Sequence, residues 1–274
     1  MRGSLGEKIG EGAYADVHTW APGQVLKLFK SGFPRQHSWW EARMIRAVFA
    51  AGAPAPEVLD EVTVEGRFGF VLQRLDGPTL VQLLQTRAVG LEEAGSILAT
   101  LYSSIHRTLP PLGVVPLLDF MRGALRRTGA LPEPLATGVL GLAGRLPPGD
   151  GLCHSDLHAG NVIMTADGPR AIDWLSAVRA GGFLDLACCQ VLLTELVPDG
   201  ADPGRSHALN AAIQSNYARL AGLSEEAVTG AMQPYLPIAR VFALLGPAGS
   251  SSHRARLIDR LEAALRTEAP DRRG

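Results

Sequence analysis

A chain of 274 residues that is 46% apolar and 19% charged is long enough to bury a full hydrophobic core and lacks the composition of a disordered protein. Its formal net charge of −1, without any run of basic residues, argues against nucleic acid or a membrane surface as its partner. The first residues contain no apolar signal core and no segment reaches about 18 apolar residues, so we expect a cytoplasmic protein.

The first predicted elements are two short strands, residues 9–18 and 24–29, joined through an Ala-Pro-Gly turn. Gly10 and Gly12 lie in the first of them. A glycine lets the backbone approach a ligand closely, with its amides facing phosphate oxygens. Because such pairs also occur in turns that bind nothing, the glycines alone leave both interpretations open.

Lys27 lies in the middle of the second strand, between Leu26 and Leu28, where an ammonium group needs an anionic partner. One interpretation is that its side chain reaches solvent from an edge strand. The other is an ion pair with Glu41, on a helix predicted over residues 38–49 with Ser38 as its N-cap.

Two further strands are predicted over residues 58–64 and 68–74, and a turn at 75–78 ends this sheet. We therefore expect a domain boundary there. Beyond it, helices are predicted over residues 79–86, 91–108, 116–127, 133–145, 182–197, 206–222, 224–245 and 251–268. Pro234 and Pro237 should kink or split the seventh helix, which should start at Ser224, and residues 270–274 should be frayed.

Three cysteines, Cys153, Cys188 and Cys189, lie in apolar segments without metal-ligand spacing, and we interpret them as reduced core residues. His106 ends an apolar helical stripe, and we expect it to cap the helix or to pack in the core.

Polar groups stand between two apolar runs in residues 152–164, LCHSDLHAGNVIM. Asp156 and Asn161 are five residues apart, and Asp173 lies twelve residues further on, at the end of another apolar run. Buried polar groups are costly without partners. Because carboxylate and amide oxygens are the ligands of hard divalent cations, this set predicts a metal site.

Phosphoryl transfer requires the groups that these segments supply. It uses backbone amides and a cation on the phosphates, oxygen ligands for magnesium, and a carboxylate that orients the attacking hydroxyl. An Asp-to-Asn gap of five residues lets one loop present a base and a metal ligand to the same nucleotide. Each match is weak alone, but the ordered set favours a phosphoryl-transfer enzyme.

The run HSDLHAGN at 154–161 resembles the catalytic loop, usually H-G-D-x-H-x-x-N, of the aminoglycoside phosphotransferase and choline kinase-like family. Residues 172–174, Ile-Asp-Trp, resemble its metal-binding strand end, and residues 10–17, Lys27, Glu41, 70–77 and 183–187 follow in family order. The resemblance implies an α+β, two-lobed protein-kinase-like fold, with a small antiparallel-sheet lobe carrying one main helix and a larger, mainly helical lobe. It implies a nucleotide-binding lobe at residues 1–76 and a lobe with the catalytic loop and acceptor pocket at residues 77–274.

The resemblance also implies a role for each matching residue. Asp156 would be the catalytic base or hydroxyl-orienting group, while Asn161 and Asp173 would hold Mg²⁺ on the phosphates of ATP. Lys27, held by Glu41, would contact the α- and β-phosphates. The remaining nucleotide contacts would come from Gly10, Gly12, Ala13, Tyr14 and Val17 of the glycine loop, from Val25 above adenine, and from the backbone of Gln73 and Leu75. Asp185 and His154 would brace the loop rather than react.

Three positions can be compared with the residues that related kinases usually carry there. Ser155 replaces the common glycine, a small change that we expect to be tolerated. Ala15 stands at the third glycine position of a G-x-G-x-x-G loop and should stiffen it. His158, usual in this family, stands where protein kinases carry a lysine, and lies near the γ-phosphate or simply holds the loop.

Two spacings favour a small-molecule hydroxyl as acceptor. Only eleven residues separate Asp173 from Asp185, which leaves little room for a peptide-docking segment, and extra helical chain precedes Asp156. The alternatives are a protein kinase-like enzyme with a protein acceptor and a nucleotide-binding pseudoenzyme that acts as a regulatory module. From residue 175 onward, ten acidic residues balance ten basic ones, so a neutral acceptor fits as well as a polycationic aminoglycoside. We expect a small group of acidic residues either to line an acceptor pocket or to lie on solvated helix faces: Glu195, Asp199, Asp202, Glu225 and Glu226.

Overall fold

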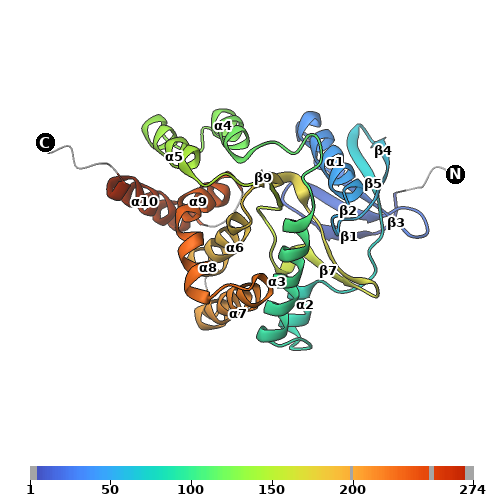
Figure 1. Ribbon diagram of the computed structural model, residues 1–274. Helices are drawn as coiled ribbons and strands as arrows, with labels where there is room; N and C mark the ends of the chain where they lie inside the picture. The colour runs from blue at the N-terminus through green and yellow to red at the C-terminus, as the bar shows by residue number, and fades with distance from the viewer. Residues whose placement is uncertain (1–4, 198–199, 247–249, 269–274) are drawn as a thin grey trace, which may run out of the picture.

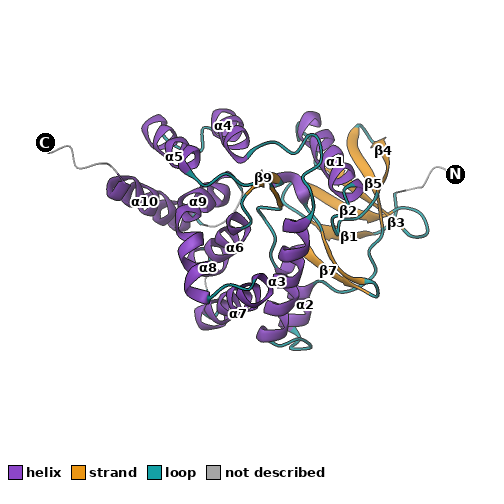
Figure 2. Cartoon of the chain, viewed as in Figure 1, coloured by secondary structure: helices purple, strands orange, loops and turns teal. Residues whose placement is uncertain are grey.

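The computed structural model describes residues 5–197, 200–246 and 250–268. Strands gather towards the N-terminal end of the chain and helices make up most of the C-terminal part (Figures 1 and 2). This arrangement confirms the predicted α+β class. None of the described helices is long and apolar enough to cross a membrane. The predicted fraying at residues 270–274 falls outside the described residues.

The N-terminal part is a five-stranded antiparallel sheet with the order β1-β2-β3-β5-β4. Its strands are β1 (Lys8–Glu11), β2 (Ala15–Thr19), β3 (Gln24–Phe29), β4 (Val58–Val64) and β5 (Arg67–Gln73). The prediction of one strand over residues 9–18 was wrong. The Gly12 N–H donates to the Ala15 carbonyl at 2.8 Å and closes a turn, so β1 and β2 are separate paired strands.

Alternation along β3 separates the two faces of the sheet. Leu26 and Leu28 pack with Val71 in a small cluster on one face, whereas Phe29 joins the main core on the other. Because side chains alternate along a strand, Lys27 shares the face of Phe29. The lysine therefore points towards the face on which α1 packs.

Helix α1 (Arg35–Ala50) covers that face with Ala42, Ile45 and Val48. The prediction that Ser38 caps this helix was wrong, because α1 begins three residues earlier, after Pro34. Ser38 is fully buried inside the helix, where its hydroxyl donates to the Arg35 carbonyl at 2.9 Å. Proline, with its fixed φ, can precede a helix without any side-chain cap.

The segment after β5 passes close to the strand that follows the catalytic loop. The Met164 N–H donates to the Pro78 carbonyl at 2.9 Å, and Thr79 forms an isolated bridge with Ile163. Helix α2 (Leu80–Gln85) starts directly afterwards with a capping box formed by Thr79 and Gln82. The connection between the two parts of the molecule is thus held by backbone pairing.

Gly77 is expected to be indispensable in this connection. Its φ is +151°, and a Cβ atom there would lie 1.9 Å from the Met164 carbonyl oxygen. We expect Gly77→Ala to lower the free energy of unfolding by roughly 2–4 kcal/mol, measured by urea denaturation. Gly66→Ala is the matched control, because Gly66 also has a positive φ, +76°, but a Cβ there would meet nothing within 4 Å. Equal losses in the two variants would contradict the close-contact explanation.

The C-terminal part is mainly helical, as predicted. Its helices after α2 are α3 (Leu91–Arg107), α4 (Leu117–Thr128), α5 (Glu133–Arg145), α6 (Phe183–Glu195), α7 (Pro203–Ala221), α8 (Glu225–Met232), α9 (Leu236–Leu245) and α10 (Ser251–Glu268). The predicted split at the prolines is confirmed, because the 3₁₀ turn η3 (Gln233–Tyr235) separates α8 from α9. Ser224 caps α8 as predicted, accepting from the Ala227 N–H at 3.1 Å.

Four short strands frame the polar stretch. β6 (Gly151–Cys153) pairs with β9 (Val178–Ala180), and β7 (Val162–Thr165) pairs with β8 (Gly168–Ala171). The 3₁₀ turns η1 (Ala159–Asn161) and η2 (Trp174–Ser176) lie between them. Asp156 therefore lies in the loop between β6 and η1, and Asp173 follows β8 directly.

All three cysteines are buried and unpaired, which confirms their prediction as reduced core residues. One core cluster extends from Phe70 and Ile45 in the N-terminal part to Tyr102 and Trp174 in the C-terminal part. The region of Asp173 is therefore anchored in a core that both parts share.

Candidate active site

Lys27 joins three segments that are far apart in the sequence. Its Nζ donates to Glu41 Oε1 at 2.5 Å and to Asp173 Oδ1 at 3.5 Å. Burial alone would lower the pKa of Lys27, but the carboxylates of Glu41 and Asp173 raise that pKa above its ordinary value, so the ammonium stays charged. The predicted pair with Glu41 is present, and the alternative that Lys27 reaches solvent from an edge strand is wrong, because β3 is central and the lysine side chain is only 17% exposed.

Asp156 lies in a loop whose backbone is held from within. Its N–H donates to His154 Nδ1 at 3.3 Å, and its carbonyl accepts from Asn161 Nδ2 at 2.9 Å. His154 Nε2 in turn donates to the Ile172 carbonyl at 3.0 Å. These partners assign the neutral tautomer of His154, whose pKa burial lowers, and support the prediction that it is scaffold.

The carboxyl group of Asp156 lies in an environment that disfavours its charge. Burial, together with the carboxylates of Asp173 and Asp185, raises the pKa of Asp156 to about 7. The Lys27 ammonium, in contrast, lowers the pKa of Asp173. Two nearby aspartates are thus tuned in opposite directions, as expected of a site that needs one proton acceptor and one permanent anion.

We expect Asp156→Asn to stabilise the free protein more at alkaline than at acidic pH. An unfolded aspartate ionises near pH ~4, and this one ionises at about 7 in the folded protein, so its contribution to stability is present at low pH and is lost as the pH rises between these values. Asparagine carries no such cost. The difference in melting temperature between variant and wild type should therefore be larger at about pH 8.5 than at about pH 5. The exposed Asp167→Asn serves as control, and a difference that does not vary with pH would refute the assigned burial of this charge.

Two residues beside the loop adopt left-handed backbone conformations. Asp173 has a φ of +69° and Ser155 a φ of +64°. Aspartate tolerates this region, but serine has no such advantage. The Ser155 hydroxyl is also buried without a hydrogen-bond partner among the described residues. The serine that replaces the usual glycine is accommodated, but at a cost that the sequence did not reveal.

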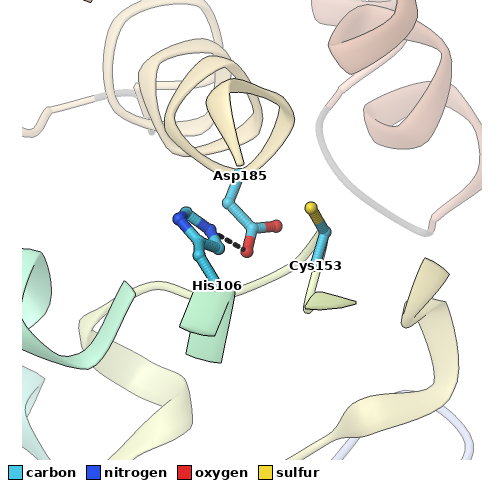
Figure 3. Close-up of side chains that lie close together, drawn as sticks. All are labelled: His106, Cys153 and Asp185. Atoms are coloured by element: carbon cyan, nitrogen blue, oxygen red, sulfur yellow. Dashed lines mark hydrogen bonds and ion pairs between the residues drawn. The ribbon is translucent and has the colours of Figure 1, made fainter. Parts of the chain in front are cut away.

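Asp185 braces the loop from helix α6, as predicted. Its carboxylate accepts from the backbone N–H groups of His154 at 3.0 Å and Ser155 at 2.6 Å. It also accepts from His106 Nε2 at 3.0 Å (Figure 3). His106 Nδ1 contacts the Tyr217 hydroxyl at 2.9 Å. His106 therefore packs in the interior, one of its two predicted places, and its role as a partner of Asp185 is new.

The ligand atoms of His106, Cys153 and Asp185 lie within 4.8 Å of one another, the spacing of a metal site (Figure 3). Their contacts argue against one. Both Asp185 oxygens already accept hydrogen bonds, and burial raises the pKa of the Cys153 thiol well above its ordinary value, which keeps it protonated. Because a metal ligand must be a thiolate, we interpret the group as a hydrogen-bonded brace.

The predicted glycine loop is the turn between β1 and β2. Gly10 pairs with Val17, while residues 12–14 form the turn, and the Tyr14 ring packs on Phe33 at 5.1 Å. Neither Gly10 nor Gly12 has a positive φ, so the turn itself does not require glycine there. Ala15 is buried at the start of β2, which fixes the end of the loop in the core.

The predicted adenine contacts lie at the end of the central strands. Val25 of β3 is buried and pairs with Leu72 of β5. The Gln73 N–H already donates to the Glu57 carbonyl at 2.9 Å, whereas no backbone hydrogen bond of the described residues uses the Leu75 N–H. Of the two predicted backbone contacts, the Leu75 N–H is therefore available to a ligand, whereas Gln73 has only its carbonyl available.

His158 holds the loop, one of its two predicted roles. It caps η1, with Nδ1 accepting from the Gly160 N–H at 3.1 Å. Burial lowers its pKa, so the ring is neutral at physiological pH.

The acidic residues of the C-terminal part do not form a cation-binding wall. Glu195 is buried against Arg240 and Arg260, at 3.0 and 2.8 Å. Asp202 caps α7. Glu225 and Glu226 lie on the exposed first turn of α8, and Asp199 falls outside the described residues.

The fold is that of known kinases of small molecules. The chain is similar to a choline/ethanolamine kinase family protein from Mesorhizobium loti (18% identity, TM-score 0.60, covering 98% of this chain and 89% of that one). It is similar to a choline kinase from Cryptosporidium parvum (12%, 0.59, 97% and 89%) and to APH(2″)-IIa in a ternary complex with streptomycin and ATP (14%, 0.56, 95% and 91%). At these identities the similarity shows the protein-kinase-like fold and not the substrate. No curated protein sequence matches the chain.

The family assignment rests on the sequence itself. The model of the phosphotransferase enzyme family (APH) matches residues 9–223. This range includes the strand lysine, the catalytic-loop motif and the aspartate that follows β8. We conclude that the chain belongs to the phosphotransferase enzyme family.

Proposed function

We propose that this protein is an ATP- and Mg²⁺-dependent kinase that transfers the γ-phosphate of ATP to a hydroxyl group of a small molecule. The observation that carries the proposal is the meeting of Lys27, Glu41 and Asp173 at one point, next to a loop that holds Asp156 and Asn161. A permanent cation, an ionised carboxylate and a carboxylate of raised pKa are the charges that phosphoryl transfer uses.

The N-terminal lobe, residues 1–76, is proposed to bind the nucleotide. Lys27, fixed by Glu41, would contact the α- and β-phosphates, and the turn with Gly10 and Gly12 would bring backbone amides to them. Neither glycine has a positive φ, so the conformation of the turn does not by itself require glycine. A close approach of the backbone to phosphate would require it, which supports this role. The carbonyl of Gln73 and the N–H of Leu75 would bind adenine beneath Val25, and the ATP bound by APH(2″)-IIa supports ATP as the donor.

Asn161 and Asp173 fit a magnesium ion. Because Asn161 uses Nδ2 to hold the Asp156 carbonyl, its Oδ1 remains available as a ligand. Among the described residues no hydrogen bond or ion pair uses Asp173 Oδ2, and the side chain is 45% exposed. This all-oxygen donor set suits Mg²⁺, which would neutralise phosphate charge when bound.

Asp156 is proposed to orient and deprotonate the acceptor. As the acceptor oxygen bonds to the γ-phosphorus and the bond to the β-phosphate oxygen breaks, the hydroxyl proton passes to the Asp156 carboxylate and ADP leaves. A pKa of about 7 is well matched to this task near neutral pH.

The C-terminal lobe, residues 77–274, is proposed to bind a small acceptor. The chain between Asp173 and Asp185 consists of η2 and of β9, which pairs with β6, so it forms no long platform for a peptide. Relatives of the same fold carry the names of choline kinases and aminoglycoside phosphotransferases. The paired or helix-capping acids described above give no preference for a polycation, so an amino alcohol, a sugar or a neutral antibiotic fits equally.

The test is an ADP-release screen of the purified protein over aminoglycosides, macrolides, choline, homoserine and sugars, with Asp156→Ala as the blank. At least one hydroxyl compound should raise ADP release above the blank only in the presence of Mg²⁺. Magnesium-dependent ATP binding without transfer to any acceptor would instead favour a pseudoenzyme. Transfer only to a protein substrate would favour a protein kinase.

A further inference from the structure

A buried tyrosine on α3 contacts the catalytic loop directly. Tyr102 is completely buried, and its hydroxyl donates to the backbone carbonyl of Leu157 at 2.5 Å. Leu157 follows Asp156 in the chain, so this bond holds the peptide group between Leu157 and His158, one residue beyond the proposed base. Because α3 packs along α7 and against β6, the hydroxyl is attached to a rigid part of the lobe.

The other bonds to Asp156 have a different origin. His154 holds its N–H and Asn161 holds its carbonyl from within the loop, and both of these residues are hydrogen-bonded to the Ile172 backbone. Asp185 ties the loop to α6 before Asp156, through His154 and Ser155. Tyr102 ties it to α3 after Asp156. The loop is thus fixed to the body of the lobe on both sides of the carboxylate.

One face of α3 supports both of these attachments of the loop. His106 lies one turn after Tyr102, with the two rings stacked at 6.0 Å, and it donates to Asp185. The ring of Tyr102 lies in the main core, where phenylalanine would fill almost the same volume. Only the hydroxyl requires tyrosine, and it donates to the Leu157 carbonyl at 2.5 Å, with the Cys189 thiol as a second nearby partner. Burial also raises the pKa of Tyr102 well above its ordinary value, so it remains a donor.

We propose that Tyr102 is a positioning residue for Asp156. Its hydroxyl fixes the Leu157–His158 peptide group after the base and, together with Asp185 before the base, holds the Asp156 carboxylate in place for the acceptor hydroxyl. This inference rests on the proposed function, because it requires Asp156 to be the reacting group. A displacement of about 1 Å in a reacting group costs on the order of 10²-fold in rate.

Tyr102→Phe removes the hydroxyl alone and leaves the Leu157 carbonyl unpaired. We expect kcat to fall about 10- to 100-fold with the best acceptor of the screen, while the KM for ATP stays within about twofold, because Lys27 and Asp173 are untouched. Tyr235→Phe is the matched control. Tyr235 is also a buried tyrosine of this lobe, at 3% exposure. No hydrogen bond joins it to residues 154–161 in the described structure, so its variant should keep the wild-type kcat.

Hydrogen exchange gives a readout that needs no turnover. In the free full-length protein, the backbone amides of residues 154–161 should exchange about tenfold faster in Tyr102→Phe than in the wild type, the factor expected for one lost hydrogen bond. In Tyr235→Phe their exchange rates should equal those of the wild type. Faster exchange with lower kcat supports the proposal. The proposal is overturned if Tyr102→Phe keeps the exchange rates or the kcat of the wild type. It is also overturned if the loss of kcat is matched by an equal loss of affinity for ATP, which would indicate general destabilisation. If the wild type phosphorylates no acceptor, the proposed function fails, but unchanged exchange of the loop would still be needed to refute the anchoring by Tyr102.

Discussion

Asp156→Ala is expected to reduce kcat by roughly 10³-fold while the affinity for ATP stays within about twofold of wild type. In the described part of the chain, no hydrogen bond or ion pair joins the Asp156 carboxylate to the side chains of Lys27, Glu41 or Asn161, so its removal leaves the groups proposed to bind nucleotide in place. The loop keeps its backbone hydrogen bonds to His154 and Asn161. ADP release with the best acceptor measures the first quantity, and titration calorimetry with ATP and Mg²⁺ measures the second.

Asp167→Ala is the control for this substitution, because it removes an exposed carboxylate from the turn between β7 and β8. It should leave both quantities unchanged. Asp156→Asn adds a second arm that preserves volume and should be as inactive as alanine, since an amide cannot accept the hydroxyl proton. Retention of more than roughly a tenth of wild-type kcat in Asp156→Ala would show that another group is the base.

The core of the site could be predicted because its signals are local. The loop pattern places Asp156 and Asn161 five residues apart between apolar runs, and burial makes such polar groups improbable without a purpose. Lys27 was informative for the same reason, as a charge in an apolar strand. In each case a few neighbouring residues contain both the anomaly and the evident need for a partner.

Asp185 was predicted as a support of the loop from the family resemblance, but the supporting contacts of Tyr102 and His106 could not be predicted because their partners are distant. Tyr102 is 55 residues from Leu157, and His106 is 79 residues from Asp185. Neither spacing has a period that sequence reasoning can use, and both residues also suit a plain apolar helix face. A short motif therefore indicates candidate reacting groups, but it does not indicate distant side chains such as Tyr102 and His106 that hold them.

Local cues also misled where tertiary packing decided. Ser38 has the preferred side chain for a helix start, but the core buries it one turn inside α1. Glu195 was expected to line a pocket or to lie on a solvated helix face, but it is buried and paired with Arg240 and Arg260. Gly77 looked like an ordinary turn glycine, and only the approach of Met164 shows why a side chain is excluded.

Asp173→Asn is expected to abolish turnover by a different route, through the metal-bound nucleotide. Asparagine is the appropriate replacement because it tolerates the left-handed conformation, with a φ of +69°, and keeps an oxygen in place. It removes the negative charge that pairs with the Lys27 ammonium and that would bind the proposed divalent cation. The affinity for ATP with Mg²⁺ should fall at least about tenfold, whereas the affinity for ATP in the presence of EDTA should change little.

The two aspartates are also coupled, which makes this variant diagnostic. Because the Asp173 carboxylate helps to raise the pKa of Asp156, Asp173→Asn should lower that pKa below about 7. Carboxyl NMR titration of the free protein measures the shift directly, with Asp167→Asn as control. A lower Asp156 pKa together with a selective loss of magnesium-dependent binding would assign separate roles to the two carboxylates. Equal losses with and without Mg²⁺ would instead mean that Asp173 serves Lys27 rather than the metal.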